Sequence, residues 1–272
     1  MNVFITGAAG GLGRAMAVEC GYRGYNMFLT DMNEEGLSRI KKGLEAQFGV
    51  TVTAKACDLM DAKSVDVMLD TLDKHEICFD MLLNVAGLDY EGGFIKRERE
   101  DLVKIVSVNN SATIRITHAI LKRRRQNKHF TVVFVSSLAS MFPMPLKATY
   151  AASKRFLLDF SIALRQELKY ANANVLALCP GGMVTNQGTL EGIAAQGFWG
   201  NATTNPLETV ARKTIDRARE GKEIYVPGGL NRILAFLGKI IPRSWVAAAI
   251  YSRWNQAQDK WLNSFIENKN SV

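Results

Sequence analysis

The sequence predicts an α/β fold: a single doubly wound domain with a parallel sheet of about seven strands and helices on both faces. Short apolar runs alternate with longer amphipathic stretches across residues 1–229, as is typical of a parallel sheet covered by helices. A glycine cluster directly follows the first apolar run. No repeat or long linker divides the chain, so we expect one domain over residues 1–229 and a helical extension over residues 230–272.

The expected strands are short and rich in apolar residues. They span residues 3–5, 27–29, 50–56, 81–83, 131–135, 174–178 and 223–226. The stretches between them place apolar residues at helical spacing. They span residues 11–23, 34–48, 62–75, 99–124, 150–169 and 207–219. Helical crossovers between parallel strands are right-handed, so the carboxyl ends of the strands meet at one edge, where open parallel sheets bind ligands.

The composition is that of an ordinary globular protein, with 47% apolar and 22% charged residues. The net charge of +8 suits an anionic ligand, but the positive residues are scattered, and we expect no nucleic-acid partner. The four cysteines, Cys20, Cys57, Cys78 and Cys179, lack metal-ligand spacing. We therefore expect reduced thiols, no metal and a cytoplasmic protein, with no signal peptide and no membrane-spanning run.

The segment that links the first expected strand to the first expected helix has the sequence TGAAGGLG. Glycines let the backbone turn sharply and approach a pyrophosphate, and a helix N-terminus offers free N–H groups to it. A glycine cluster can also be an ordinary tight turn, but its position between strand and helix favours a dinucleotide site. We expect the cofactor to contact Thr6, Gly7, Gly11, Leu12 and Gly13.

Asp31 ends the second expected strand, eighteen residues after Gly13. A carboxylate at this place can accept hydrogen bonds from the ribose hydroxyls of the adenosine, and it would repel the 2′-phosphate of NADP. No arginine follows it; Met32 and Asn33 do. The sequence therefore predicts NAD rather than NADP, while a simple helix-capping role for Asp31 is the alternative.

Tyr150 and Lys154 are four residues apart on an expected helix, so they share one face. The same pattern can be a packed aromatic beside a solvated lysine. Hydride transfer to a ketone, however, needs a proton donor for the developing alkoxide. A tyrosine has an unperturbed pKa of about 10, and bringing this pKa to about 7 requires about 4 kcal/mol of preference for the phenolate. A lysine ammonium and an oxidised nicotinamide both favour the phenolate.

The glycine spacing Gly7-x-x-x-Gly11-x-Gly13 resembles that of the short-chain dehydrogenase/reductase family in its compact, single-domain Rossmann-type form. The resemblance spans approximately residues 2–228. It implies an NAD(H)-dependent oxidoreductase that interconverts an alcohol and a ketone. It also implies a homodimer or homotetramer paired through long helices, here residues 99–124 and 150–169.

The resemblance assigns further cofactor contacts to residues that follow the third, fourth and sixth expected strands. These are Asp58 and Leu59; Asn84, Ala86 and Gly87; and Pro180, Gly181, Met183 and Thr185. Val85 departs from the usual Asn-Asn-Ala-Gly sequence of the family. Tyr150 and Lys154 are expected to contact the cofactor as well.

Two more catalytic residues come from the same resemblance. Ser137, thirteen residues before Tyr150, corresponds to a serine that hydrogen-bonds the substrate oxygen, and Ser136 is its confusable neighbour. Asn109 corresponds to an asparagine that bends its helix and holds a water on the proton path to Lys154. Asn110 is the alternative to Asn109. Two successive asparagines within a helix are unfavourable and already ask for a reason.

The segment 186–206, rich in glycine and apolar residues, is expected to form a mobile lid over a bulky hydrophobic substrate. Expected wall residues are Leu190, Ile193, Phe198, Trp199, Met141, Phe142, Pro143 and Met144. The same residues would equally suit simple packing. The leading substrate is a hydroxysteroid, as for hydroxysteroid dehydrogenases of the family; the alternative is a 3-oxoacyl or other lipid-chain ketone. A dinucleotide-binding regulatory protein without turnover is a third possibility.

The extension over residues 230–272 carries an apolar stripe that Pro242 interrupts. The stripe consists of Ile233, Leu234, Phe236, Leu237, Ile240 and Ile241, and a second stretch carries Trp245, Tyr251, Trp254 and Trp261. Such stripes usually pack in a core or between subunits. They can also cover an active site or lie on a membrane surface, so the extension is a candidate for peripheral membrane contact.

Overall fold

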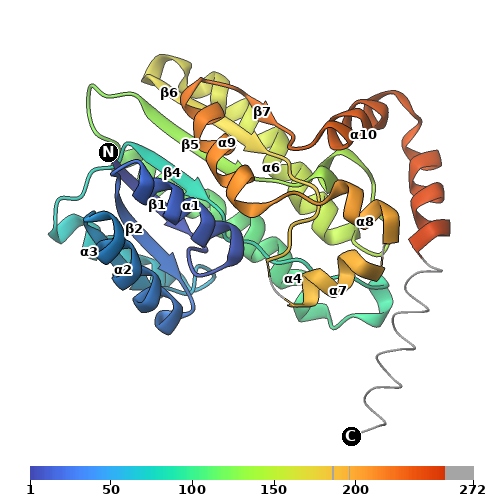
Figure 1. Cartoon of the computed structure of the whole chain (residues 1–272), viewed down its shortest axis with the longest axis horizontal. Coiled ribbons are helices and arrows are strands. Elements are labelled where there is room, and N and C mark those ends of the chain that lie inside the picture. The colour runs from blue at the N-terminus through green and yellow to red at the C-terminus, as the bar shows by residue number, and fades with distance from the viewer. Residues whose placement is uncertain (186, 196, 255–272) are drawn as a thin grey trace, which may run out of the picture.

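The computed structural model describes residues 1–185, 187–195 and 197–254 (Figure 1). One seven-stranded sheet runs in the order β3-β2-β1-β4-β5-β6-β7, and every neighbouring pair is parallel. The strands are β1 (Asn2–Thr6), β2 (Asn26–Asp31), β3 (Val52–Ala56), β4 (Met81–Asn84), β5 (Phe130–Val135), β6 (Ala173–Leu178) and β7 (Ile224–Tyr225). The predicted fold class is confirmed.

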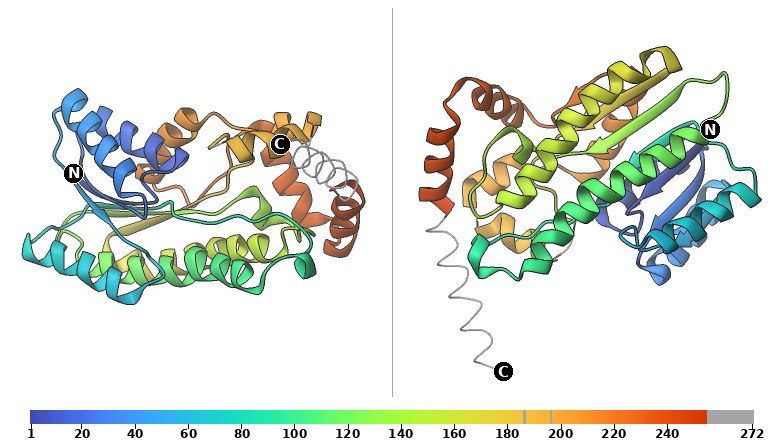
Figure 2. Two further views of the ribbon diagram at one scale, coloured as in Figure 1. Left: turned by 90° about the horizontal axis from the view of Figure 1, so that it is seen from below. Right: turned by 180° about the vertical axis from the view of Figure 1, so that it is seen from behind.

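Helices cover both faces of this sheet (Figure 2). The main ones are α1 (Gly11–Tyr22), α2 (Glu34–Phe48), α3 (Ala62–Lys74), α4 (Arg99–Val106), α5 (Thr113–Lys122), α6 (Ala148–Glu167) and α9 (Leu207–Arg219). The core on one face packs α1, α2 and α9 against the sheet, and the core on the other packs α3, α5 and α6.

Alternation along β1 decides which of its side chains enters which core. Val3 and Ile5 enter the core under α1, whereas Phe4 enters the opposite one, because successive side chains of a strand point to opposite faces. There Phe4 stacks on Phe28 with ring centres 5.1 Å apart and meets the edge of Phe79 at 5.4 Å. The first two strands, β1 and β2, therefore contribute side chains to both cores.

The expected long helix over residues 99–124 is interrupted. A π-helical turn, Ser107–Ala112, separates α4 from α5 and contains both successive asparagines. Asn109 and Asn110 are buried, and their side-chain amides bond to groups outside the helix. These outward bonds account for the irregularity, because asparagine competes with regular helical bonding.

Two helices occupy the segment for which the sequence indicated only a glycine-rich lid: α7 (Gln187–Ala195) and α8 (Gly197–Thr203). A tertiary contact holds the end of α8, since Asn231 donates to the carbonyl of Thr203 at 3.0 Å. Locally, the hydroxyl of Thr204 donates to the carbonyl of Gly200 at 2.7 Å. The expected mobility of this lid stays a prediction. The side chains of Phe198 and Trp199 lie outside the described part of the chain.

The C-terminal extension is helical as far as the structure describes it. Helix α10 (Gly229–Ile240) ends just before Pro242, and residues 243–254 are helical again. Figure 1 shows α7, α8, α10 and the following helix together at the end of the molecule away from the N-terminus. This is the end to which the parallel strands point. Trp261 and the rest of 255–272 lie outside the described residues.

Candidate active site

A cavity of about 1530 Å³ runs along the carboxyl edge of the sheet. Most residues that the sequence assigned to a site line this cavity. They are Gly7, Gly11, Leu12, Gly13, Asp31, Asp58, Leu59, Ala86, Gly87, Ser137, Tyr150, Lys154, Gly181, Met183 and Thr185. Thr6, Asn84, Asn109 and Pro180 lie behind its wall, where they bond to the segments that form it.

At two of its glycines, Gly7 and Gly13, the loop is too tightly packed for a side chain. Gly7 has a φ of +65°, and a Cβ there would lie 2.8 Å from the backbone of Ala86. A Cβ on Gly13 would lie 2.0 Å from the carbonyl oxygen of Gly7. Thr6 fixes the loop from behind, because its hydroxyl accepts from the backbone N–H groups of Val85 and Ala86 at 3.0 and 3.1 Å. The loop can therefore present its backbone to a phosphate.

Asp31 sits at the end of β2 with both carboxylate oxygens directed at backbone N–H groups. Its Oδ2 accepts from Ala9 of the glycine loop and its Oδ1 from Asn33, both at 3.0 Å. The cap of α2 is Asn33, whose side chain accepts from Gly36 at 2.9 Å. Asp31 is thus not the cap of that helix, and its carboxylate borders the cavity beside the glycine loop.

Asn84 and Pro180 support the cavity wall without lining it. The Asn84 amide donates to the hydroxyl of Thr117 in α5 at 3.1 Å, away from the cavity. The carbonyl of Pro180 accepts from the N–H of Leu138 at 2.7 Å and so joins the segments after β5 and β6. Both residues hold strand ends in place, which is an indirect way of shaping a cofactor cleft.

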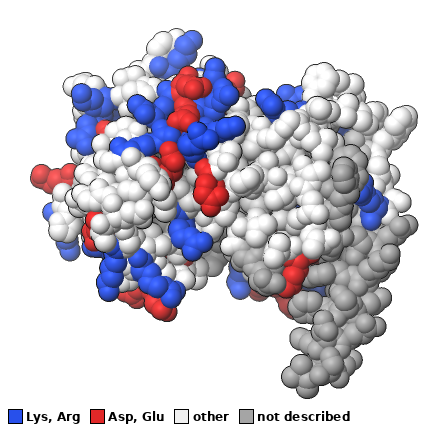
Figure 3. All heavy atoms as spheres, viewed as in Figure 1, with Lys and Arg blue, Asp and Glu red and all other residues white. Residues whose placement is uncertain are grey.

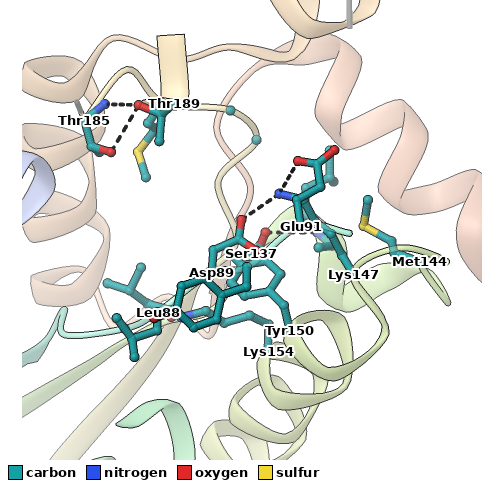
Figure 4. Close-up of a pocket in the computed structure, with 18 of the residues that line it drawn as sticks. Leu88, Asp89, Glu91, Ser137, Met144, Lys147, Tyr150, Lys154, Thr185 and Thr189 are labelled. Atoms are coloured by element: carbon teal, nitrogen blue, oxygen red, sulfur yellow. Dashed lines mark hydrogen bonds and ion pairs between the residues drawn. The ribbon is translucent and has the colours of Figure 1, made fainter. Parts of the chain in front are cut away.

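Ser137, Tyr150 and Lys154 come together at the middle of the cavity (Figure 4). The Ser137 side chain lies close enough to the Tyr150 hydroxyl to lower the pKa of that hydroxyl. The Nζ of Lys154 lies 5.7 Å from the centre of the Tyr150 ring and donates to the carbonyl of Val135 at 2.9 Å. Ser136 instead donates to the backbone carbonyl of Lys154 at 2.7 Å. The geometry therefore favours Ser137 over its neighbour.

The protein surroundings alone do not make Tyr150 acidic. Burial and the carboxylate of Asp89 raise the pKa of Tyr150 to about 12, although the Ser137 side chain and the charge of Lys147 act to lower it. Burial lowers the pKa of Lys154 to about 8 against the attraction of Asp89. Lowering the pKa of Tyr150 from there to about 7 would take roughly 7 kcal/mol, which these surroundings do not supply.

Asn109 is fully buried and hydrogen-bonds to the segment that follows β4. Its Oδ1 accepts from the N–H of Leu88 at 2.8 Å, and its Nδ2 donates to the carbonyl of Leu88 at 3.0 Å and to the hydroxyl of Ser153 at 2.9 Å. A Cβ on Gly87 would lie 3.1 Å from both Asn109 Oδ1 and Lys154 Nζ. Asn109 is thus close to Lys154, whereas Asn110 bonds to the backbone of Ser153.

Lys147, Asp89 and Glu91 form a charged cluster at the cavity that the sequence did not indicate. Lys147, the residue before α6, places its Nζ 2.7 Å from Asp89 Oδ2 and 3.2 Å from Glu91 Oε2. Burial opposes the charge of Lys147, yet the two carboxylates raise its pKa. Its position three residues before Tyr150, on the same turn, was the one available signal.

The far wall of the cavity is apolar. Of the expected wall residues, Phe142, Met144 and Ile193 line it, and the extension adds Leu234, Leu237, Ile241, Trp245, Val246 and Ile250. The apolar stripe of α10 is divided between two environments. Leu234 and Leu237 border the cavity, whereas Ile233, Phe236 and Ile240 are about 60% exposed. The extension therefore covers the active site with one face and leaves another open.

Comparison with known proteins identifies the family. Residues 1–191 match the model of the short chain dehydrogenase family. The chain is 30% identical over 259 residues to a Mycobacterium tuberculosis protein named as oxidoreductase SadH, covering 90% of this chain and 94% of that protein.

Other relatives match less of the chain or only its fold. A very-long-chain 3-oxoacyl-CoA reductase of Laccaria bicolor is 30% identical over 175 residues, 63% of this chain and 51% of the reductase, so the chain spans about half the length of that relative. A short-chain dehydrogenase from Sphingobium yanoikuyae in complex with NADPH superposes with a TM-score of 0.73 at 23% identity, covering 88% of this chain and 92% of that one. With the family match over residues 1–191 and the ordered strand-end motifs, this chain belongs to the short-chain dehydrogenase family.

Proposed function

We propose that this oxidoreductase interconverts a secondary alcohol and a ketone on a bulky lipophilic substrate, with NAD(H) as its cofactor. The observation that carries the proposal is the position of Tyr150. Its side chain lies beside Ser137 in a cavity with a glycine loop at one end and an apolar wall at the other. A cofactor and a lipophilic substrate would therefore meet beside the Tyr150 hydroxyl.

In the proposed reaction the carbonyl carbon gains a hydride and the carbonyl oxygen gains a proton. A nicotinamide cofactor held at the glycine loop would supply this hydride, or accept it in the reverse direction. Ser137 donates a hydrogen bond to the substrate oxygen, and Tyr150 transfers its proton to that oxygen as the alkoxide develops. The ammonium of Lys154 stabilises the resulting phenolate, and Asn109 holds the backbone beside Lys154 through Leu88.

The preference for NAD rests on the carboxylate of Asp31 at the end of β2. A fixed negative charge there disfavours the 2′-phosphate of NADP. We expect a higher kcat/KM with NADH than with NADPH, and a smaller ratio in Asp31→Asn. Asp66→Asn, which removes an exposed charge from α3, should leave the ratio unchanged. A wild type that prefers NADPH would overturn the cofactor assignment.

The substrate class is proposed from the apolar wall. A hydroxysteroid and a 3-oxoacyl chain both suit a large apolar cavity, and the name of the Laccaria bicolor relative favours the acyl chain. Steady-state rates with 3-oxosteroids, 3-oxoacyl thioesters of increasing chain length and short polyols would separate these classes. Turnover of polyols without turnover of either lipophilic class would refute the proposal.

Membrane contact through the extension is also proposed. The exposed Ile233, Phe236 and Ile240 form one face of α10, and Lys239 and Arg243 lie beside them. In Figure 3 the face over α7 and α8 carries few charges, whereas lysine and arginine gather on the other half of the molecule. In the part of the chain that the structure describes, no helix is long and apolar enough to cross a bilayer. Contact would therefore be peripheral.

Flotation with vesicles that contain phosphatidylserine tests this contact. We expect wild type to float and the double variant Phe236→Ser, Ile240→Ser to float less. Val67→Ser, which removes a similarly exposed apolar side chain from α3, is the matched control. Equal flotation of the double variant and wild type would exclude the α10 face.

A homodimer or homotetramer remains a proposal. Exposed apolar side chains on α4, α5 and α6 support pairing through these helices: Val103, Val106, Ile114 and Phe156 are 41% to 50% exposed. Sedimentation velocity of wild type and Phe156→Glu tests this arrangement. A wild type that sediments as a monomer at micromolar concentration would contradict it.

A further inference from the structure

Two ammonium groups, not one, lie beside the Tyr150 ring. The Nζ of Lys147 is 5.6 Å from the ring centre, and that of Lys154 is 5.7 Å from it. Lys154 is the cation that the reaction scheme above uses. Lys147 reaches the ring from the N-terminal side of the same helix, and its side chain is only 14% exposed. A second buried cation at the same distance calls for a role of its own.

The charge of Lys147 is tied to a carboxylate that itself faces the tyrosine. Lys147 Nζ and Asp89 Oδ2 are 2.7 Å apart, and Glu91 Oε2 is 3.2 Å away on the other side of the ammonium (Figure 4). Asp89 raises the pKa of Tyr150, whereas Lys147 acts to lower it. The two charges of the pair therefore act on the ionisation of Tyr150 in opposite directions.

The backbone holds this pair in register with the catalytic groups. Asn109 bonds to both backbone groups of Leu88, the residue before Asp89. The N–H of Gly92 donates to the carbonyl of Leu146 at 2.8 Å, directly before Lys147. Backbone hydrogen bonds thus hold the segments that carry Asp89 and Lys147. Their charges therefore stay at a fixed distance from Tyr150 and can act on its ionisation.

We propose that Lys147 is a positioning residue for proton transfer: held by Asp89, it keeps a second positive charge beside Tyr150 and offsets the negative charge of that carboxylate. The inference rests on the proposed function, in which Tyr150 transfers the proton. It extends that function by assigning a role to the Lys147–Asp89 pair, which the residues named from the sequence do not include.

The charged and titratable groups around Tyr150 come from several segments. They are Lys147 and Lys154 from α6 and the residue before it; Asp89, Glu91 and Arg97 after β4; Cys179 at the end of β6; and Arg253 in the C-terminal helical segment. Lys147 and Asp89 both act directly on the tyrosine and bond to each other. Changing these two residues singly and together therefore isolates the pair from the other charges.

The test follows ionisation at position 150 directly. A fluorinated tyrosine, more acidic than tyrosine itself, is placed there, and its pKa is read from the 19F chemical shift against pH. A charge at 4–6 Å changes a pKa by about one unit or more. We expect Lys147→Gln to raise the pKa by about that amount, Asp89→Asn to lower it, and the double variant to lie between the two. Lys122→Gln, an exposed lysine at the end of α5, should match wild type.

Equal pKa values in wild type, Lys147→Gln and Asp89→Asn would overturn the inference. If Lys147→Gln fails to fold by circular dichroism, Asp89→Asn alone decides, because it must still lower the pKa. The pH profile of kcat/KM should follow the same order as the NMR values. Loss of kcat without any change in the profile would indicate a structural role instead. The NMR readout needs no turnover, so an inactive wild type would refute the proposed function and leave this test intact.

Discussion

Lys154 is a buried cation, and its burial should cost the fold stability at neutral pH. Its side chain is 4% exposed, and burial lowers its pKa from 10.5 to about 8. This difference corresponds to about 3 kcal/mol. Because the folded pKa lies below the unfolded one, the protonated lysine favours unfolding. The cost is fully present below about pH 8, fades as the pH rises towards 10.5, and is absent above it.

Lys154→Met removes this charge while keeping a long side chain. The substitution also leaves the carbonyl of Val135 without the donor that now lies at 2.9 Å. Losing this hydrogen bond costs about 1 kcal/mol, which offsets part of the gain from removing the charge. We therefore expect the variant to be more stable than wild type by about 2 kcal/mol at pH 7. Near pH 10 the remaining charge cost and the lost hydrogen bond should roughly cancel.

Urea denaturation at both pH values measures the effect, with Lys122→Met as the control for an exposed lysine. The control should change stability little at either pH. A Lys154→Met protein that is less stable than wild type at pH 7, or equally changed at pH 7 and pH 10, would refute the reasoning. The stabilised Lys154→Met variant should at the same time lose turnover. This combination would show that the Lys154 charge serves the reaction and lowers the stability of the fold.

Three further predictions concern the same site. Tyr150→Phe should bind NAD(H) as wild type does in a fluorescence titration but lose about 10² to 10⁴ in kcat; unchanged turnover would refute the mechanism, and unchanged binding without turnover in wild type would favour a non-catalytic protein. Gly13→Ala should fail to bind NAD(H) and unfold at lower temperature by calorimetry, because its Cβ would lie 2.0 Å from the oxygen of Gly7; normal binding would contradict this. Asn109→Ala leaves both backbone groups of Leu88 without their present partners and should lower stability by about 2–4 kcal/mol in urea titrations; a loss below about 1 kcal/mol would show that water replaces the side chain.

The sequence sufficed for the sheet and for the residues at strand ends, because both follow from local pattern. Apolar runs such as Thr131–Val135 are buried along their length, so periodicity finds them. Ends of parallel strands share one edge, so Asp31 and Ser137 could be placed together without knowledge of side-chain contacts.

Contacts between distant segments could not be predicted in the same way. Asp89 and Lys147 are 58 positions apart, and charged residues on loops are usually solvated. Helix α8 begins at a glycine and contains another, so its propensity is poor; contacts such as that between Asn231 and Thr203 hold it. The division of the α10 stripe into a cavity face and an exposed face likewise depends on where the helix docks.

The π-helical turn Ser107–Ala112 has a consequence for how this helix can change length. A regular helix advances by about 100° per residue, so the wider turn shifts the rotational phase of everything after it. Ile105 before the turn and Ile116 and Ile120 after it are all buried, while Asn109 inside it faces Leu88. The wide turn takes up about one extra residue, so deleting one residue here would restore a regular helix without rotating its two halves relative to each other. The core isoleucines would then stay buried, whereas Asn109 would lose the turn that directs it at Leu88, so a deletion here should harm the site more than the core.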